Sequence, residues 1–238
     1  EDFLTFDLSA VAGVRQDLGG LGIVGAAAVN TSLSTDVWAD PYVTGRDREE
    51  TERVANGYRL TWDRVLGSGL EIEFSARETE IDDERSGQDL GLNPAERALL
   101  DRNGDLNRVE IGYELRFADN RHIVTPGLLY READRDGDAM ANDGYGASVN
   151  YIYVHDQRWR WVFNLAYQGA EYDAVNPVYG VQDEFDRFGA SATVFYSAPF
   201  GWKRWALNAT LGYFEEDHDI DFYDTSVGAA TVGLFRQF

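Results

Sequence analysis

The feature that most constrains this chain is an alternation of apolar and polar residues with a period of two. The clearest example runs from 204 to 214, where one face is apolar and the other is mostly small or polar. The apolar face carries Trp205, Leu207, Ala209, Leu211 and Tyr213, and the other carries Arg204, Ala206, Asn208, Thr210 and Gly212. Successive side chains of a β-strand point to opposite faces, whereas apolar residues of a helix recur every three or four positions. The alternation therefore predicts β-strands with one apolar face.

Eleven segments show this alternation, and the connections between them are alternately short and long. The strands are expected at 3–15, 20–33, 55–66, 69–79, 106–118, 121–132, 144–155, 158–170, 186–197, 203–214 and 226–238. Short turns lie at 17–20, 66–69, 118–121, 155–157 and 198–203, and long loops at 32–53, 78–107, 132–144, 171–186 and 215–226. Outer-membrane β-barrels have this asymmetry, with short periplasmic turns and long extracellular loops. A soluble β-sandwich has no physical reason to keep it.

Aromatic residues lie mainly at the ends of the apolar faces, where the interfacial girdles of a membrane barrel belong. Examples are Phe117, Trp159, Tyr167 and Tyr196. No stretch approaches the roughly 18 consecutive apolar residues that a transmembrane helix needs. We therefore predict an all-β fold, a transmembrane antiparallel up-and-down β-barrel of about 12 strands, in a single domain that covers residues 1–238.

The strand count raises a question about the N-terminal side. If the short turns and the C-terminus are periplasmic, eleven strands place Glu1 on the extracellular side. Bacterial single-chain barrels usually have an even number of strands. We therefore expect a twelfth strand before Glu1. The alternative, a further strand within 32–44, is weakened by Pro41, because proline lacks a donor for the ladder.

Composition excludes several classes of function. The chain contains no cysteine, so disulfides and thiolate metal sites are ruled out. Its formal net charge of -21 argues against nucleic acid as a partner.

Three loop segments carry motifs that point to a family. They are Val37–Gly45 (VWADPYVTG), Asn176–Gly180 (NPVYG) and Asp219–Asp224 (DIDFYD). Together with the strand pattern, they resemble a proteobacterial outer-membrane family known only as a domain of unknown function, DUF2860, over the whole chain. In that family the segment similar to Phe3–Arg15 is an internal strand, which agrees with a twelfth strand. The resemblance implies the barrel fold and the outer membrane, and it assigns no catalytic residues.

Charged side chains on the polar faces are the first candidates for function. The expected pore-lining residues are Arg59, Glu71, Glu73, Arg77, Arg108, Glu110, Glu114, Arg116, Arg131, Arg158, Arg160, Arg187 and Arg204. The acids lie on the strands between 56 and 118 and the later strands contribute mainly arginines, so we expect the two groups to face each other across the lumen. Such a field would orient zwitterionic or anionic solutes. The alternative is an ion-pair network that closes the barrel, since unpaired buried charges are costly.

Two acidic loop segments are candidate calcium sites. Asp134, Asp136 and Asp138 place oxygen donors at alternate positions around a glycine, and 101–105 is similar. Neither completes the EF-hand pattern, so turn-forming loops are the alternative. A short helix is expected in the loop 78–107, with Asn93 as its cap and Pro94 in its first turn. It either folds over the mouth or forms a surface turn.

The three histidines give a weak indication of catalysis. His122 and His155 fall at short turns, and only His218 lies among the long loops, between Asp217 and Asp219. Flanking carboxylates can orient an imidazole, but a single histidine in an acidic loop is usually solvated. We therefore expect no enzymatic activity and no cofactor other than the calcium candidate.

These observations predict a protein of the outer membrane of a Gram-negative bacterium. The favoured function is a narrow porin-like channel for small polar or charged solutes. The alternative is a non-conducting surface or scaffold protein whose acidic loops bind a protein partner or calcium. The expected partners are the lipid bilayer, lipopolysaccharide and the solutes themselves.

Overall fold

The computed structural model describes residues 5–38, 48–81, 87 and 90–236 of the 238-residue chain. Its strands are β1 (Thr5–Asp17), β2 (Ile23–Trp38), β3 (Arg48–Asp63), β4 (Leu70–Ile81), β5 (Gly104–Tyr113), β6 (Leu115–Phe117), β7 (His122–Arg135), β8 (Asn142–Val154), β9 (Trp159–Asn176), β10 (Val181–Ser197), β11 (Trp205–His218) and β12 (Thr225–Arg236). The connections contain the helix α1 (Pro94–Ala98) and the 3₁₀ turns η1 (Gly19–Leu21), η2 (Val65–Gly67), η3 (Pro199–Gly201) and η4 (Asp221–Tyr223). None of the helices in these ranges has the length and apolar character needed to cross a membrane.

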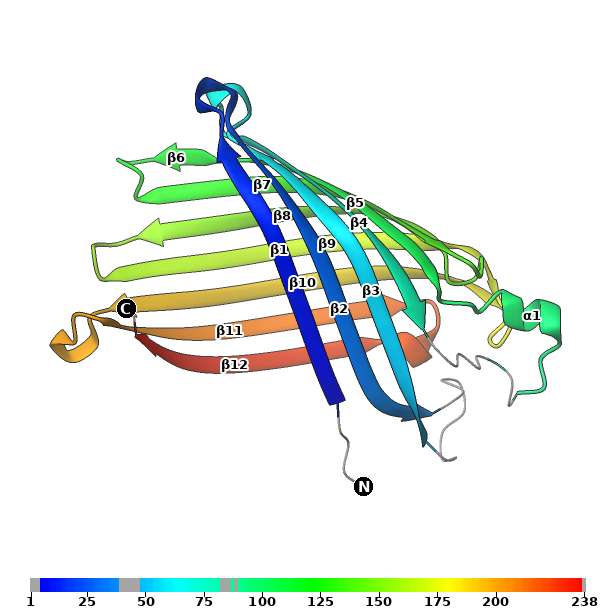
Figure 1. Ribbon diagram of the computed structural model, residues 1–238. Helices are drawn as coiled ribbons and strands as arrows, with labels where there is room; N and C mark the ends of the chain where they lie inside the picture. The colour runs from blue at the N-terminus through cyan, green and yellow to red at the C-terminus, as the bar shows by residue number, and fades with distance from the viewer. Residues whose placement is uncertain (1–4, 39–47, 82–86, 88–89, 237–238) are drawn as a thin grey trace.

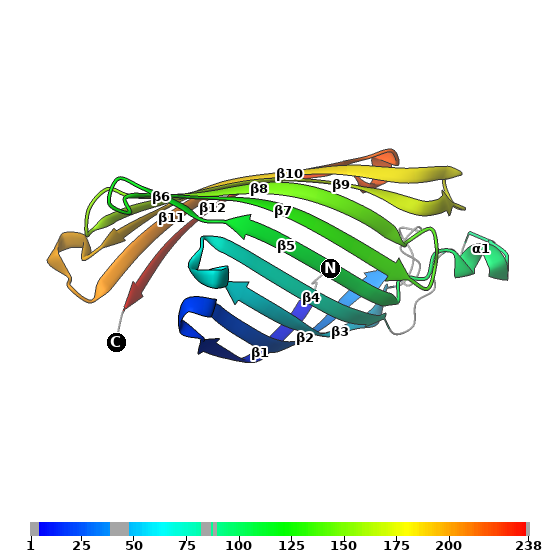
Figure 2. The same ribbon diagram turned by 90° about the horizontal axis from the view of Figure 1, so that it is seen from above.

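The strands form one antiparallel sheet in which neighbours along the chain pair with each other (Figure 1). β6 follows β5 after a break at Glu114, whose N–H donates to the carbonyl of Gly69 at 2.7 Å. Both pair with β7, so they correspond to the single strand predicted at 106–118. The pairing of described residues runs from β1 at one end of the path to β12 at the other. The sheet curves so that β1–β5 face β8–β12 across an interior (Figure 2). The prediction of an all-β, up-and-down barrel of about 12 strands is confirmed.

Large apolar side chains cover the outer face of the sheet. On β9, Trp161, Phe163 and Leu165 are 38%, 39% and 49% exposed although all three are apolar. A barrel in a membrane presents such residues to lipid. Tyrosine hydroxyls mark one edge of this apolar band, because Tyr167 donates to the carboxylate of Asp186 on the same face. This edge lies towards the long loops.

Carboxylates replace the apolar residues on the outer face beyond this edge. Directly paired positions on neighbouring strands include Glu78 with Asp105, Glu132 with Asp143, and Asp143 with Glu171. Like charges that face each other across a ladder repel, and the hydrocarbon core of a bilayer would make the repulsion worse. The strand ends that carry these carboxylates therefore lie outside the apolar band.

Several strands continue into segments that the alternation predicts to be long loops. β2 extends to Trp38 and β3 begins at Arg48, β10 begins at Val181, and β11 ends at His218. The predicted loops at 32–53, 171–186 and 215–226 are therefore too long. On β9, β10 and β11 the prediction was wrong because the outer face is acidic there, as at Glu171, Asp186 and Asp217, so the apolar alternation stops while the backbone pairing continues.

The inner face is polar and is hydrogen-bonded from strand to strand. Asn150 of β8 donates to Asn164 of β9 at 2.8 Å, and Asn164 donates to Ser191 of β10 at 3.1 Å. The hydroxyls of Thr193 and Thr210 join β10 to β11 at 2.9 Å. The polar faces identified in the sequence thus line the concave side of the sheet.

The loop helix forms as predicted. The Asn93 side chain accepts the N–H groups of Ala95 and Glu96 at 2.9 and 3.1 Å, and the Glu96 carboxylate accepts the N–H of Asn93. This capping box satisfies N–H groups that a helix N-terminus leaves open. α1 lies beyond the strand ends at the long-loop end in both views (Figures 1 and 2).

Candidate functional site

Two cavities on the concave side of the sheet bring charged residues together. The first has a volume of about 350 Å³ and lies towards the short turns, between β3 and β8. Its acidic lining consists of Asp63, Glu71, Glu73, Glu110 and Glu114, with Thr61, Thr125, Ser148 and Asn150 among its neutral polar residues. We call this cavity the acidic chamber. Four of the predicted pore acids therefore meet in one place.

Ion pairs balance part of the charge in the acidic chamber. The pairs are Asp63 with Arg15 at 2.5 Å, Glu110 with Arg108 at 2.7 Å, and Glu114 with Arg116 at 2.7 Å. Within the described ranges, Glu71 and Glu73 have no ion-pair partner. The predicted set of arginines that face the acids includes Arg116, which does pair with Glu114, whereas Glu110 pairs with Arg108 of its own strand and not with an arginine of a later strand. Residues two positions apart on a strand share a face and lie about 7 Å apart, within reach of an arginine side chain.

The other predicted pore residues are spread over the inner face and the turns. Arg59, Arg77, Arg131, Arg160 and Arg187 belong to β3, β4, β7, β9 and β10, whereas Arg158 and Arg204 lie in the short turns just before β9 and β11. The guanidinium of Arg160 stacks over the ring of Phe195 at 4.6 Å. The predicted arginines therefore lie on several strands and in two short turns.

The three aspartates of the calcium candidate do not converge. Asp134 is the penultimate residue of β7, while the backbone N–H of Asp136, just after the strand, donates to the carbonyl of Asn103 at 2.9 Å. In the part of the chain that the structure describes, no three His, Cys, Asp or Glu side chains form a group able to hold a metal ion. Asp134, Asp136 and Asp138 thus belong to a loop that packs on the neighbouring segment 101–103.

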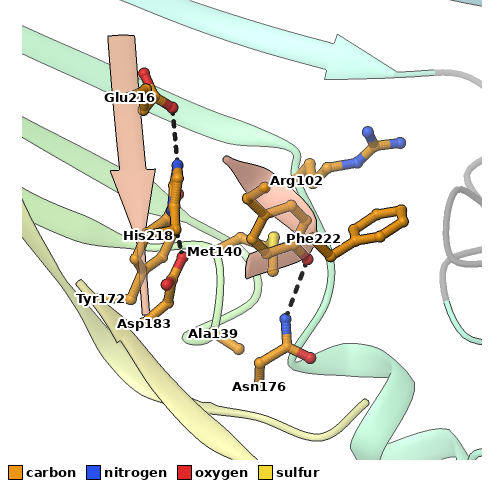
Figure 3. A pocket seen from close by; sticks show the side chains of 10 residues that line it. Arg102, Ala139, Met140, Tyr172, Asn176, Asp183, Glu216, His218 and Phe222 are labelled. Atoms are coloured by element: carbon orange, nitrogen blue, oxygen red, sulfur yellow. Dashed lines mark hydrogen bonds and ion pairs between the residues drawn. The ribbon is translucent and has the colours of Figure 1, made fainter. Parts of the chain in front are cut away.

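The second cavity lies at the long-loop end, beyond the edge of the apolar band, and has a volume of about 290 Å³ (Figure 3). Its lining consists of Arg102, Ala139, Met140, Tyr172, Asn176, Asp183, Glu216, His218, Phe222 and Tyr223. These residues come from the ends of β9, β10 and β11, from η4 and from the connections that precede β5 and β8. We call this cavity the mouth pocket.

A buried chain of charged groups forms one wall of the mouth pocket (Figure 3). The ring nitrogens of His218 lie 2.7 Å from Asp183 and 2.9 Å from Glu216, and Glu216 also pairs with Arg187. The His218 and Asp183 side chains are each only 4% exposed. Asp183 also accepts the N–H of Ile220 at 3.2 Å, which ties β10 to the segment that leads into η4. The expectation of a solvated histidine is therefore wrong.

Two of the three family motifs meet at the opposite wall. Asn176 of the motif at 176–180 donates to the hydroxyl of Tyr223, in the motif at 219–224, at 3.3 Å. The rings of Tyr179 and Phe222, one from each of these motifs, lie 6.0 Å apart. Most of the motif at 37–45 lies outside the described residues. The sequence features that suggest the family thus converge on the mouth pocket.

The surroundings of the pocket shift the pKa of two of its side chains. Burial raises the pKa of Tyr172 to about 12, and the nearby carboxylate of Asp183 acts in the same direction. For Glu216, burial opposes ionisation, but hydrogen bonds from Arg187 and His218 outweigh it and lower its pKa. The pocket therefore holds Glu216 ionised and Tyr172 protonated at neutral pH.

Sequence reasoning identified His218 but assigned it the wrong partners. Asp217 and Asp219 are its neighbours in sequence, whereas the residues that bond its ring are Asp183 and Glu216. Glu216 could have been found, because positions two apart on a strand share a face. Asp183 lies 35 residues away and reaches His218 only through the pairing of β10 with β11.

A solved structure with a similar fold is LpxR from Salmonella typhimurium, with a TM-score of 0.50 and 13% sequence identity, over 97% of this chain and 88% of that one. Curated proteins give no match in sequence. The likeness shows the fold of an outer-membrane β-barrel. LpxR is an enzyme, so the expectation of no enzymatic activity is contradicted: a barrel of this architecture is compatible with catalysis. The buried pairing of His218 with Asp183 is the kind of arrangement that this expectation overlooked.

The family model described as a protein of unknown function, DUF2860, matches residues 1–235. This match covers nearly the whole chain, including the two motifs that form the mouth pocket. It confirms the resemblance noted from the loop motifs. The chain belongs to the DUF2860 family.

Proposed function

We propose that this protein is an outer-membrane passage for small polar solutes, with a lumen that favours cations and neutral molecules over anions. In this proposal the short turns are periplasmic and the mouth pocket opens to the extracellular side. The observation that carries it is a series of cavities with charged residues in their linings along the concave side of the sheet.

Shared residues connect these cavities. The acidic chamber shares Glu110 and Ser148 with a cavity of about 260 Å³ that Arg108 and Arg187 also line. Arg187 in turn pairs with Glu216, which lines the mouth pocket. Polar side chains thus follow the interior from the short turns to the long loops. A filled apolar core would leave no such series.

The charge of the acidic chamber supports a preference for cations. The chamber has no Lys, Arg or His in its described lining. Arg15, Arg108 and Arg116 balance only three of its five carboxylates, which leaves Glu71 and Glu73 to set the local potential. A narrow cavity lined by one sign of charge concentrates counter-ions. Anions would meet the opposite effect.

Single-channel recording of the purified protein in a planar bilayer tests this proposal. Under a KCl gradient we expect a reversal potential of the sign set by potassium. The double variant Glu71→Gln/Glu73→Gln should move that potential by more than half of the way to zero while the channel still opens. The matched control is Glu78→Gln/Glu80→Gln, which removes the same charge from the outer face of β4. A silent bilayer, or equal selectivity in the two double variants, would refute the proposal.

A second candidate is hydrolysis of an ester at the mouth pocket, which the pairing of Asp183 with His218 favours. A carboxylate that holds one ring nitrogen of a histidine prepares the other to accept a proton. Here the Nε2 atom of His218 bonds with Glu216, so a catalytic water would have to take the place of that contact. The water would add to the ester carbonyl, its proton would pass to Nε2, and the alcohol would leave.

Release of acid from a soluble ester such as 4-nitrophenyl butyrate tests this candidate. Activity that disappears in His218→Gln and persists in His155→Gln, a histidine at the short turns, would support hydrolysis. Equal rates for the two variants, or no rate above buffer for the natural chain, would refute it. Conductance and hydrolysis are measured separately, so each candidate stands or falls alone.

A further inference from the structure

We propose that the mouth pocket binds a neutral sugar, of the size of one or two rings, through its aromatic side and the polar wall of Asp183, Glu216 and His218. The inference extends the proposed passage by naming a solute class at its entrance, and in that sense it rests on the proposed function. Binding itself does not require that the lumen conducts.

The polar wall of the pocket can bond hydroxyls without favouring a charged ligand. Asp183 and Glu216 face the ring nitrogens of His218, and Arg187 also pairs with Glu216. A carboxylate has about four acceptor positions, so both acids can still accept from a ligand hydroxyl. The pocket already holds charges of both signs, Asp183 and Glu216 on one side and Arg102 on another, so a ligand of either charge would meet a like charge in a partly buried site. Neutral hydroxyl groups bring no charge into the site.

The hydroxyl of Tyr172 provides a further contact for a ligand. Tyr172 lines the pocket, and among the described residues its hydroxyl makes no hydrogen bond. Its raised pKa keeps the hydroxyl protonated, and therefore able to donate, at any physiological pH. The side chain of Arg102, which lines another side of the pocket, carries five N–H donors (Figure 3).

The aromatic side of the pocket suits the apolar C–H faces of a sugar ring. Phe222 and Tyr223 both line the pocket, and their rings lie 5.7 Å apart at an angle of 67°. Phe222 is 57% exposed, which is a large apolar surface for a residue outside the membrane band. Ligand sites typically combine such aromatic surface with a few placed polar groups. A sugar presents both kinds of surface at once.

Ligand-observed NMR titration of the whole protein, in micelles of a detergent without a sugar headgroup, tests the inference. The probes are D-glucose and maltose, with D-glucuronate and D-glucosamine as charged analogues that keep the same ring. We expect the neutral sugars to bind with a dissociation constant on the order of 1 mM, which is ordinary for so few atoms. The charged analogues should bind more weakly. Absence of neutral-sugar binding, or tighter binding of either charged analogue, would overturn the inference.

Variants locate the site. Phe222→Ala should weaken sugar binding by about tenfold or more, and Tyr172→Phe by about threefold to tenfold. The control is Phe200→Ala, which removes an aromatic ring that is 84% exposed at the short-turn end. Equal affinity of Phe222→Ala and the natural chain would place binding elsewhere and overturn the inference. The comparison of neutral and charged probes needs no variant, so a variant that fails to fold does not end the test.

Two sources could supply such a sugar: free solute and the headgroup of an outer-leaflet glycolipid. Lipopolysaccharide added to the same micelles distinguishes them. Displacement of glucose by lipopolysaccharide supports the site with a headgroup as its ligand, and retention of glucose supports it with a free sugar. Sugar binding without conductance would keep the site and refute the passage. Conductance without sugar binding would keep the passage and refute the sugar site.

Discussion

Replacing Asp183 with alanine is expected to release the whole long-loop end of β10 and β11. Its carboxylate is 4% exposed and accepts hydrogen bonds from His218 and from the backbone of Ile220. Removing one partner of a buried hydrogen-bonded pair leaves the other unsatisfied, which costs about 1–3 kcal/mol. The free energy of local opening should fall by that amount. Amide hydrogen exchange of residues 219–224 should then accelerate by about fivefold to a hundredfold, as about 1.4 kcal/mol corresponds to a factor of ten.

Asp217→Ala is the matched control for this variant. Asp217 lies next to His218 in sequence but is exposed. Surface substitutions of this kind usually change stability by less than about 0.5 kcal/mol. Equal acceleration of exchange in the two variants would mean that the hydrogen bonds of Asp183 do not stabilise the segment 219–224. Exchange in β8 and in the short turns should stay unchanged in both.

The second large effect is a loss of stability at alkaline pH that originates from Tyr172. Its pKa is about 12 in the folded protein, against 10.0 for a free tyrosine. The folded state therefore binds the phenolic proton more tightly than the unfolded state. The corresponding stability is fully present below pH 10 and is lost as the pH rises through 12. Two pKa units correspond to about 2–3 kcal/mol.

Urea unfolding in lipid vesicles, followed by tryptophan fluorescence between pH 9 and 12, measures this effect. Tyr172→Phe cannot ionise, so it should lose about 2–3 kcal/mol less than the natural chain over this range. Other tyrosines contribute equally to both proteins and cancel in the comparison. Parallel curves for the two proteins would show that Tyr172 is not held in its protonated form by the fold.

The apolar band was predictable from the sequence alone. Within the band, one face of every strand must contact lipid, so apolar residues such as Trp161, Phe163 and Leu165 occur at every second position of the sequence. The short turns were predictable for a related reason. They must reverse the chain within a few residues, so the alternation of apolar and polar residues is interrupted there only briefly.

The extension of the strands beyond the band was not predictable in the same way. There both faces are polar, so nothing in the pattern of β9 or β11 distinguishes a paired strand from a loop. Only the register with the neighbouring strands shows that pairing continues to Asn176 and His218. The acidic chamber shows the same limit, since the sequence supplied its acids but not the short-range pair of Arg108 with Glu110.

The sequence by itself determined that this chain folds as a barrel. It also determined which side chains of the apolar band face lipid and which face the interior. Those properties depend on local periodicity, because adjacent side chains of a strand point to opposite faces. Only the tertiary structure decided that Asp183, Glu216 and His218 form one buried wall opposite Phe222. That wall depends on the register between strands and on where the loops after β9 and β11 return. Backbone pairing between residues of β10 and β11 up to 33 positions apart, such as Phe185 and His218, sets the register, and it leaves no mark on the order of residues along the chain.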